Sequence, residues 1–167
     1  MKHAIALTLL TVAASILSSR DAAACQCFIE SVQKTDTQLV EVVRTDRDKA
    51  LAVFAGTVID QNTFSVTLEV ERAWKGPAVK VLTLSTSAKV YEDGNIGISS
   101  CDYPFKTGGK YLVFANPTEQ SSSEMRATSC TLTTMWKDAN DTVRRLDGLA
   151  EREKRLREPS PRRRSVH

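Results

Sequence analysis

The sequence predicts a mainly β protein that is crosslinked by disulfides. Short hydrophobic segments recur between turn residues, one segment alternates strictly between apolar and polar side chains, and the chain contains four cysteines. The length of 167 residues corresponds to one domain. With 41% hydrophobic and 26% charged residues, the composition excludes a disordered low-complexity chain.

Five short strands are expected in the middle of the chain. The clearest begins at Phe64 and alternates apolar with polar residues as far as Glu71, so that one face lies in water; turn residues at 75–77 end it. The other four are expected at Leu51–Asp60, Val79–Thr86, Tyr111–Ala115 and Met125–Thr134. A long loop, Ser87–Gly109, separates the third strand from the fourth. Five such strands fit a small, partly open barrel such as an OB-fold, or else a β-sandwich.

The segment before the strands, residues 29–49, has an ambiguous pattern. Leu39, Val42 and Val43 fit one face of a helix, whereas several β-branched residues lower the helix propensity. The polar run 46–49 indicates a turn or a short helix end.

Residues 137–158, after the strands, are expected to form an amphipathic helix. Asp138 or Asn140 is the expected N-cap, and prolines at 159 and 161 end the helix. The predicted apolar stripe comprises Val143, Leu146, Leu149, Ala150 and Leu156.

Basic residues are concentrated at the end of the chain. Residues 137–167 contain ten basic and six acidic side chains, whereas residues 25–136 contain eleven basic and thirteen acidic ones. The tail 159–167 is expected to be disordered, and Arg162, Arg163 and Arg164 could give it weak contact with an anionic surface. The alternative is a solvated helix face followed by a frayed tail. A nucleic-acid partner is not expected, because the strand region is net acidic.

The first 24 residues have the pattern of a signal peptide. Lys2 precedes an apolar run from Ala4 to Leu17, which is too short to span a bilayer, and Ala22–Ala24 fit a signal-peptidase site. Cleavage after Ala24 makes Cys25 the first residue of a secreted or periplasmic protein. An uncleaved membrane anchor and a lipid on Cys25 are the alternatives.

In an oxidising compartment, four cysteines indicate two disulfides. Cys25 and Cys27 are separated by one residue, so a bond between them would strain the chain, and each is expected to pair with Cys101 or Cys130. The sequence leaves both of those pairings open. A zinc site of all four cysteines is a competing hypothesis, but the chain lacks the paired C-x-x-C motifs of zinc ribbons.

The chain is not expected to be an enzyme or to hold a cofactor. It has two histidines, His3 in the leader and His167 at the end, which argues against Ser-His-Asp triads, Cys-His dyads and histidine-ligated zinc. It also lacks a Gly-x-Ser-x-Gly motif.

Several landmarks together carry a family resemblance. They are the Cys-Gln-Cys that follows the leader, VFAGTV, VTLEVERAWKG, CDYPFKTGGKYLVFA and TSCTLTT. Over about Cys25–Met135 the chain resembles the netrin-like (NTR) modules, specifically the secreted bacterial relatives of the tissue inhibitors of metalloproteinases. The resemblance implies a five-stranded OB-type barrel with flanking helices, over residues 25–136. It also implies the disulfides Cys25–Cys101 and Cys27–Cys130.

The resemblance further implies a function. In that family, the α-amine and carbonyl oxygen of the first cysteine chelate the catalytic zinc of a protease, a part that Cys25 would take here. Gln26 would enter the specificity pocket of the target. The protein would bind no metal in isolation, and its partner would be a zinc metalloprotease. The alternative function is a non-inhibitory module that binds another envelope or extracellular protein.

Overall fold

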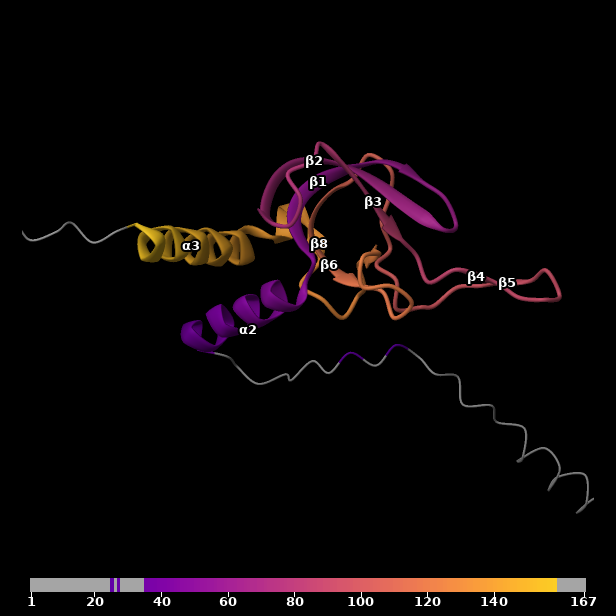
Figure 1. Cartoon of the computed structure of the whole chain (residues 1–167), viewed down its shortest axis with the longest axis horizontal. Coiled ribbons are helices and arrows are strands. Elements are labelled where there is room, and N and C mark those ends of the chain that lie inside the picture. Colours follow the sequence, from indigo (N-terminus) through magenta and orange to yellow (C-terminus); the bar gives the residue numbers. More distant parts are fainter. Residues whose placement is uncertain (1–24, 26, 28–34, 159–167) are drawn as a thin grey trace, which may run out of the picture.

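The computed structural model describes Cys25, Cys27 and residues 35–158. The expected leader, Gln26 and the basic tail lie outside these residues. The elements follow in the order α2 (Asp36–Lys49), β1 (Ala52–Gln61), β2 (Ser65–Lys75), β3 (Val81–Ser85), β4 (Lys89–Val90), β5 (Ile96–Gly97), β6 (Lys110–Pro117), β7 (Met125–Arg126), β8 (Thr134–Met135), the 3-10 turn η1 (Trp136–Asp138) and α3 (Asn140–Arg157) (Figure 1).

One antiparallel sheet dominates the fold, which confirms the mainly β prediction. Its strands run in the order β3-β2-β1-β6-β7, with β8 also paired to β6, and β4 and β5 form a separate hairpin. The sheet curls so that its edges approach each other, and the Ser85 hydroxyl, at the end of β3, donates to Glu124 beside β7. Among the described strands, the backbone ladders leave the sheet open, so a closed five-stranded barrel is not shown.

The central strands β1 and β6 are buried on both faces. On β6, Tyr111 and Val113 join one apolar cluster, inside the curled sheet, while Leu112 and Phe114 join a second cluster under the helices. This two-sided burial explains why the β6 sequence is a continuous apolar run rather than an alternating one. Gly56 lies inside β1, at a register shift between Ala55 and Gly56 in the β1–β2 ladder, as is typical of glycine at a β-bulge.

The prediction of one strand over Met125–Thr134 is wrong. The segment forms two short strands, β7 and β8, which are separated by turns that carry Cys130. Threonine side chains bond to the local backbone there: Thr131 Oγ1 donates to the carbonyl of Thr128 at 2.9 Å and accepts from the amide of Thr133 at 3.3 Å. Such local bonds compete with ladder pairing.

Phe64 is not part of the apolar face that the alternation predicts, because 46% of its surface is exposed. It lies in the turn between β1 and β2. Asn62 Oδ1 accepts from the amides of Phe64 and Ser65 at 2.8 and 3.0 Å, which closes this turn before β2 begins.

The ambiguous segment before the strands contains the helix α2, which begins with a capping box. The Gln38 amide donates to Thr35 Oγ1, and the Gln38 side chain accepts from the Thr35 amide. Of the three residues expected on the buried face, Val43 is buried, while Leu39 and Val42 are half-buried.

The second helix, α3, lies where an amphipathic helix is expected, but its N-cap differs. Ala139 occupies the cap position without a side-chain hydrogen bond, because the preceding turn η1 brings this residue into the core. Leu146 and Leu149 are buried as predicted. The helix then extends beyond the body, which leaves Leu156 86% exposed (Figure 1).

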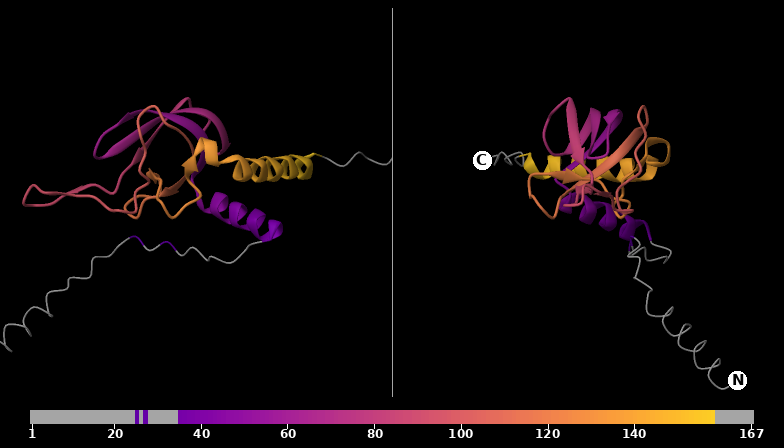
Figure 2. Two further views of the ribbon diagram at one scale, coloured as in Figure 1. Left: turned by 180° about the vertical axis from the view of Figure 1, so that it is seen from behind. Right: turned by 90° about the vertical axis from the view of Figure 1, so that its right-hand side faces the viewer.

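Seen from behind, both helices lie at one end of the molecule and the β4–β5 hairpin lies at the other (Figure 2). Neither described helix has the length and hydrophobicity that crossing a bilayer requires.

Candidate binding site at the paired disulfides

The two disulfides attach the start of the described chain to the body of the protein. Cys25 is bonded to Cys101 and Cys27 to Cys130, with a Cα–Cα distance of 5.0 Å in each pair. The partner cysteines lie in two different loops, one before β6 and one between β7 and β8. A segment of three residues is therefore held at both of its ends.

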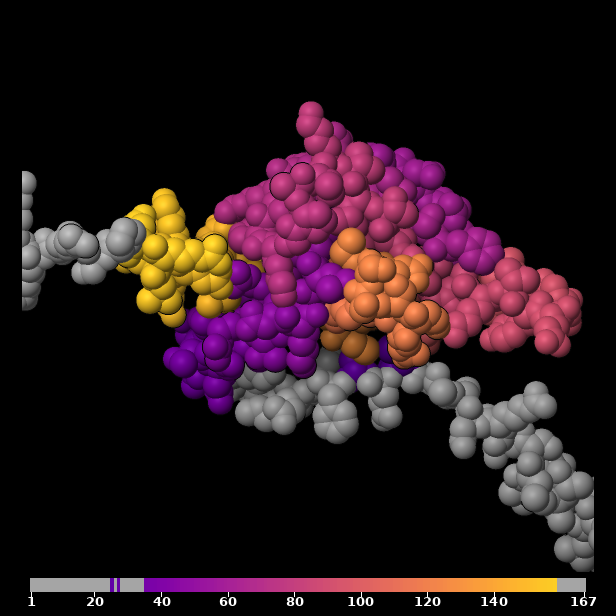
Figure 3. Space-filling view, in the orientation of Figure 1, coloured from indigo at the N-terminus to yellow at the C-terminus, as the bar shows by residue number. Residues whose placement is uncertain are grey.

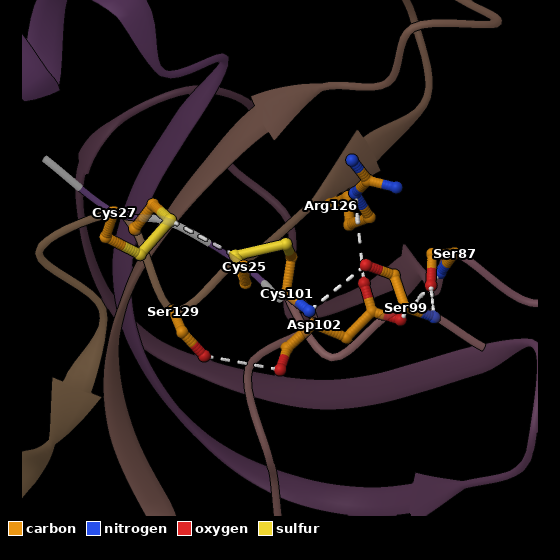
Figure 4. Close-up of a disulfide and its surroundings, with 9 residues drawn as sticks. Cys25, Cys27, Ser87, Ser99, Cys101, Asp102, Arg126 and Ser129 are labelled. Atoms are coloured by element: carbon orange, nitrogen blue, oxygen red, sulfur yellow. Dashed lines mark hydrogen bonds and ion pairs between the residues drawn. A yellow bond between two sulfur atoms is a disulfide. The ribbon is translucent and has the colours of Figure 1, made fainter. Parts of the chain in front are cut away.

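The disulfides also lie close to each other. Cys25 Sγ and Cys130 Sγ, which belong to different disulfides, are 3.4 Å apart (Figure 4). Disulfides are typical of proteins in oxidising compartments, such as the periplasm or the extracellular space.

Asp102 fixes the loop that carries Cys101. Its Oδ2 accepts from the Ser87 amide at 2.8 Å and from the Ser87 hydroxyl at 2.7 Å. The Ser87 hydroxyl accepts in turn from the Ser99 amide at 2.7 Å. Asp102 Oδ1 lies 3.9 Å from Arg126 Nε. This carboxylate therefore connects the start of the 87–109 segment, at Ser87, to the loop of Cys101 and to Arg126 of β7 (Figure 4).

Backbone contacts join the loop of Cys101 to the loop of Cys130. The Ser129 amide donates to the Cys101 carbonyl at 2.8 Å, and Asp102 pairs with Thr128 as an isolated bridge. The disulfides thus fasten to two loops that are already held side by side.

An aromatic cluster packs the loop of Cys101 against β6. Tyr103 and Phe105 meet Tyr111 of β6 edge-on, with ring centroids 5.7 and 5.0 Å apart, and the Tyr111 hydroxyl accepts from the Lys106 amide. Burial raises the pKa of Tyr103, so its phenol stays neutral at physiological pH.

The β4–β5 hairpin projects from the body beside this loop (Figure 3). Val90, Tyr91 and Ile98 are 63%, 58% and 69% exposed, respectively. At the tip, the Asn95 amide donates to Asp93 and lowers the pKa of that carboxyl, which keeps the tip negatively charged.

A groove of about 370 Å³ connects this hairpin to the disulfide region. Tyr91 and Ile98 line it on the side of the hairpin, Cys101 on the side of the disulfides, and Glu119 and Arg126 complete its wall. The groove therefore offers apolar and charged contacts next to the anchored segment.

The helices α2 and α3 carry a charged region at the end of the molecule opposite the β4–β5 hairpin. Arg47 and Glu153 make a two-pronged ion pair, with Nη2 and Oε2 2.7 Å apart, and this contact lowers the pKa of Glu153. Lys75 Nζ donates to the carbonyls of Arg47 and Asp48 at the end of α2. These contacts connect the helices to each other and to the sheet.

The structure brings together the four cysteines that the sequence analysis selected. Gln26 and Arg162–Arg164 lie outside the described residues. The sequence analysis missed Asp102 and its partner Ser87 as structural determinants of the site. The only available signal was the position of Asp102 directly after Cys101, because Ser87 lies 15 residues away in the chain.

Comparisons with known proteins do not identify a family for this chain. No protein-family model matches it, and no curated protein sequence matches it.

Proposed function

We propose that this protein is exported and inhibits a zinc metalloprotease through a new N-terminus at Cys25. The observation that carries the proposal is the attachment of Cys25 and Cys27 to two separate loops. Binding costs less conformational entropy when the inserted segment is already ordered. A short segment held at both ends is suited to entering the active-site cleft of a protease.

The chemistry resides in the main chain of Cys25. Once the leader is removed, the α-amine and carbonyl oxygen of Cys25 chelate the zinc of the target and displace its water. An α-amine has a pKa of about 7.7–8.0, so the neutral, zinc-binding form is accessible near physiological pH. The Cys25 sulfur is held in a disulfide and is not required as a ligand. Gln26 enters the pocket beside the zinc.

The hairpin and groove next to Cys101 support a large protein partner. Val90, Tyr91 and Ile98 would otherwise leave apolar surface in water, and such exposed patches mark interaction sites. In this proposal the protein acts by binding and not by catalytic turnover. The curled sheet, with β3 and β7 at adjacent edges, supports the OB-type barrel of the netrin-like modules as its fold.

One extra residue tests the mechanism. An alanine added before Cys25 of the mature protein moves the α-amine away from the chelating position, so we expect inhibition of a responsive secreted zinc protease to be lost. The matched control carries the same alanine after His167 and should inhibit like the wild type. Undiminished inhibition by the N-terminally extended protein would reject the mechanism. Mass spectrometry of the exported protein tests the premise, since a retained leader or an acyl group on the Cys25 nitrogen leaves no free α-amine there, and a lipid on the Cys25 sulfur excludes its disulfide with Cys101.

A non-inhibitory binding module is the second candidate function, and the exposed apolar hairpin favours it. The two functions differ in their need for zinc and for the free N-terminus. Capture of a partner from envelope extract that persists with a chelator, and with the alanine-extended protein, supports the second function. Loss of capture through Tyr91→Ser and Ile98→Ser would then assign the contact to the hairpin.

A further inference from the structure

The sulfur atoms of the four cysteines form one cluster, although they belong to two disulfides. The Sγ atoms of Cys25, Cys27 and Cys130 all lie within 4.8 Å of one another, and Cys101 is bonded to Cys25 (Figure 4). Four thiolates around a tetrahedral zinc ion, at Zn–S distances near 2.3 Å, are about 3.8 Å apart. The sulfurs of Cys25, Cys27 and Cys130 are therefore close enough to share one zinc ion once the S–S bonds are broken and each bonded pair has moved apart, and the Cys101 sulfur is bonded to one of them.

We propose that the reduced form of this protein binds one zinc ion through Cys25, Cys27, Cys101 and Cys130. A dithiol reductant supplies two electrons and two protons to each disulfide and becomes a disulfide itself, which leaves four thiols on the protein. Zinc then replaces the four thiol protons, which are released to water, and four Zn–S bonds form. Zinc and the disulfides are mutually exclusive at this place, and the site does not depend on the inhibitory function.

The scaffold of the site does not depend on the disulfides alone. The loops of Cys101 and Cys130 are joined by the hydrogen bond from the Ser129 amide to the Cys101 carbonyl and by the Tyr103–Ala127 backbone contact at 3.2 Å. Both hydrophobic clusters of the described core consist of other residues. Two of the ligands thus stay in neighbouring loops after reduction.

Cys25 and Cys27 supply the other two ligands from one short segment. With one residue between them, they cannot form the C-x-x-C turn of a zinc ribbon, and the sequence pattern therefore argued against zinc. The fold removes this objection, because Cys101 and Cys130 approach the pair from two other segments. The soft sulfur ligands favour zinc over magnesium or calcium.

Metal titration of the full chain tests the site. The protein is reduced with a phosphine, because a dithiol would itself compete for zinc, and is titrated with Co²⁺ as a spectroscopic substitute. We expect thiolate-to-cobalt charge-transfer and intense tetrahedral d–d absorption that saturates at one equivalent and disappears when Zn²⁺ is added. The oxidised protein should give no such absorption. No thiolate–cobalt absorption from the reduced wild type would overturn the proposal.

Two variants and a chemical probe test the ligand set. Cys130→Ser and Cys101→Ser should each weaken Zn²⁺ binding at least tenfold, whereas Ser129→Ala, beside Cys130, should bind like the wild type. Equal binding by a cysteine variant and the wild type would overturn the four-sulfur site. In the reduced wild type, Zn²⁺ should slow alkylation of all four cysteines at least tenfold, as measured by peptide mass spectrometry. This second measurement does not depend on the folding of a variant, and unprotected cysteines would count against the site.

Discussion

The hydrogen bonds of Asp102 can be tested by comparing two substitutions. Asp102→Ala removes the acceptor for both the Ser87 amide and the Ser87 hydroxyl. Asp102→Asn keeps one oxygen that can accept from both donors, but it removes the negative charge opposite Arg126. The pair therefore separates the contribution of the hydrogen bonds from that of the charge.

The expected magnitudes follow from burial. The Asp102 side chain is 18% exposed, and hydrogen bonds to charged groups contribute about 1.5–3 kcal/mol each, with partial exposure favouring the low end. We expect Asp102→Ala to lower the free energy of unfolding by about 2–4 kcal/mol. Asp102→Asn should cost about 1 kcal/mol, because the contact with Arg126 is long and partly exposed.

Urea unfolding of the oxidised protein, followed by tryptophan fluorescence, measures both values. Hydrogen exchange at the amides of Ser87 and Ser99 reports whether the loop opens locally instead. Equal losses of stability in the two variants would refute the reasoning, because the charge and not the hydrogen bonds would then hold the loop.

Three further predictions concern the sheet and the helices. Leu146→Ala should lower the free energy of unfolding by about 2–5 kcal/mol, because the Leu146 side chain of α3 is fully buried, whereas Leu156→Ala at the exposed end of the same helix should change it by less than about 0.5 kcal/mol. Thermal unfolding measures both, and similar values would contradict the packing. The hydrogen bonds with Arg47 lower the pKa of Glu153 in the folded protein, so this ion pair contributes its full stability above the pKa of Glu153 in the unfolded chain and loses it as the pH falls through the folded pKa. In Glu153→Gln, the free energy of unfolding should therefore depend less on pH over that range than in the wild type. The same pH dependence in both proteins would contradict this. Gly76→Ala should lower the free energy of unfolding by more than about 1 kcal/mol, because Gly76 has φ +102° and a Cβ there would lie 2.8 Å from the Cβ of Ala52. A melting temperature equal to that of the wild type would contradict this prediction.

Local patterns in the sequence predicted the strands well. The alternation along β2 and the apolar run of β6 depend on neighbours within a few residues, and both strands form where they were expected. Patterns failed where side chains bond to the nearby backbone, as at Thr131 and Asn62, because such bonds replace ladder pairing without changing hydrophobicity. The prediction for the end of α3 was wrong for another reason: Leu156 continues the apolar stripe, but none of the described elements covers it.

By itself, the sequence determined that the protein is mainly β and that Cys25 and Cys27 have distant partners, because strand periodicity and the reach of a disulfide are local properties. Only the tertiary structure decided that two disulfides form one sulfur cluster, that Asp102 reaches Ser87, and that Arg47 meets Glu153 across 106 residues. These contacts depend on how the curled sheet and the loops bring separate segments together. No pattern within a single segment contains that information.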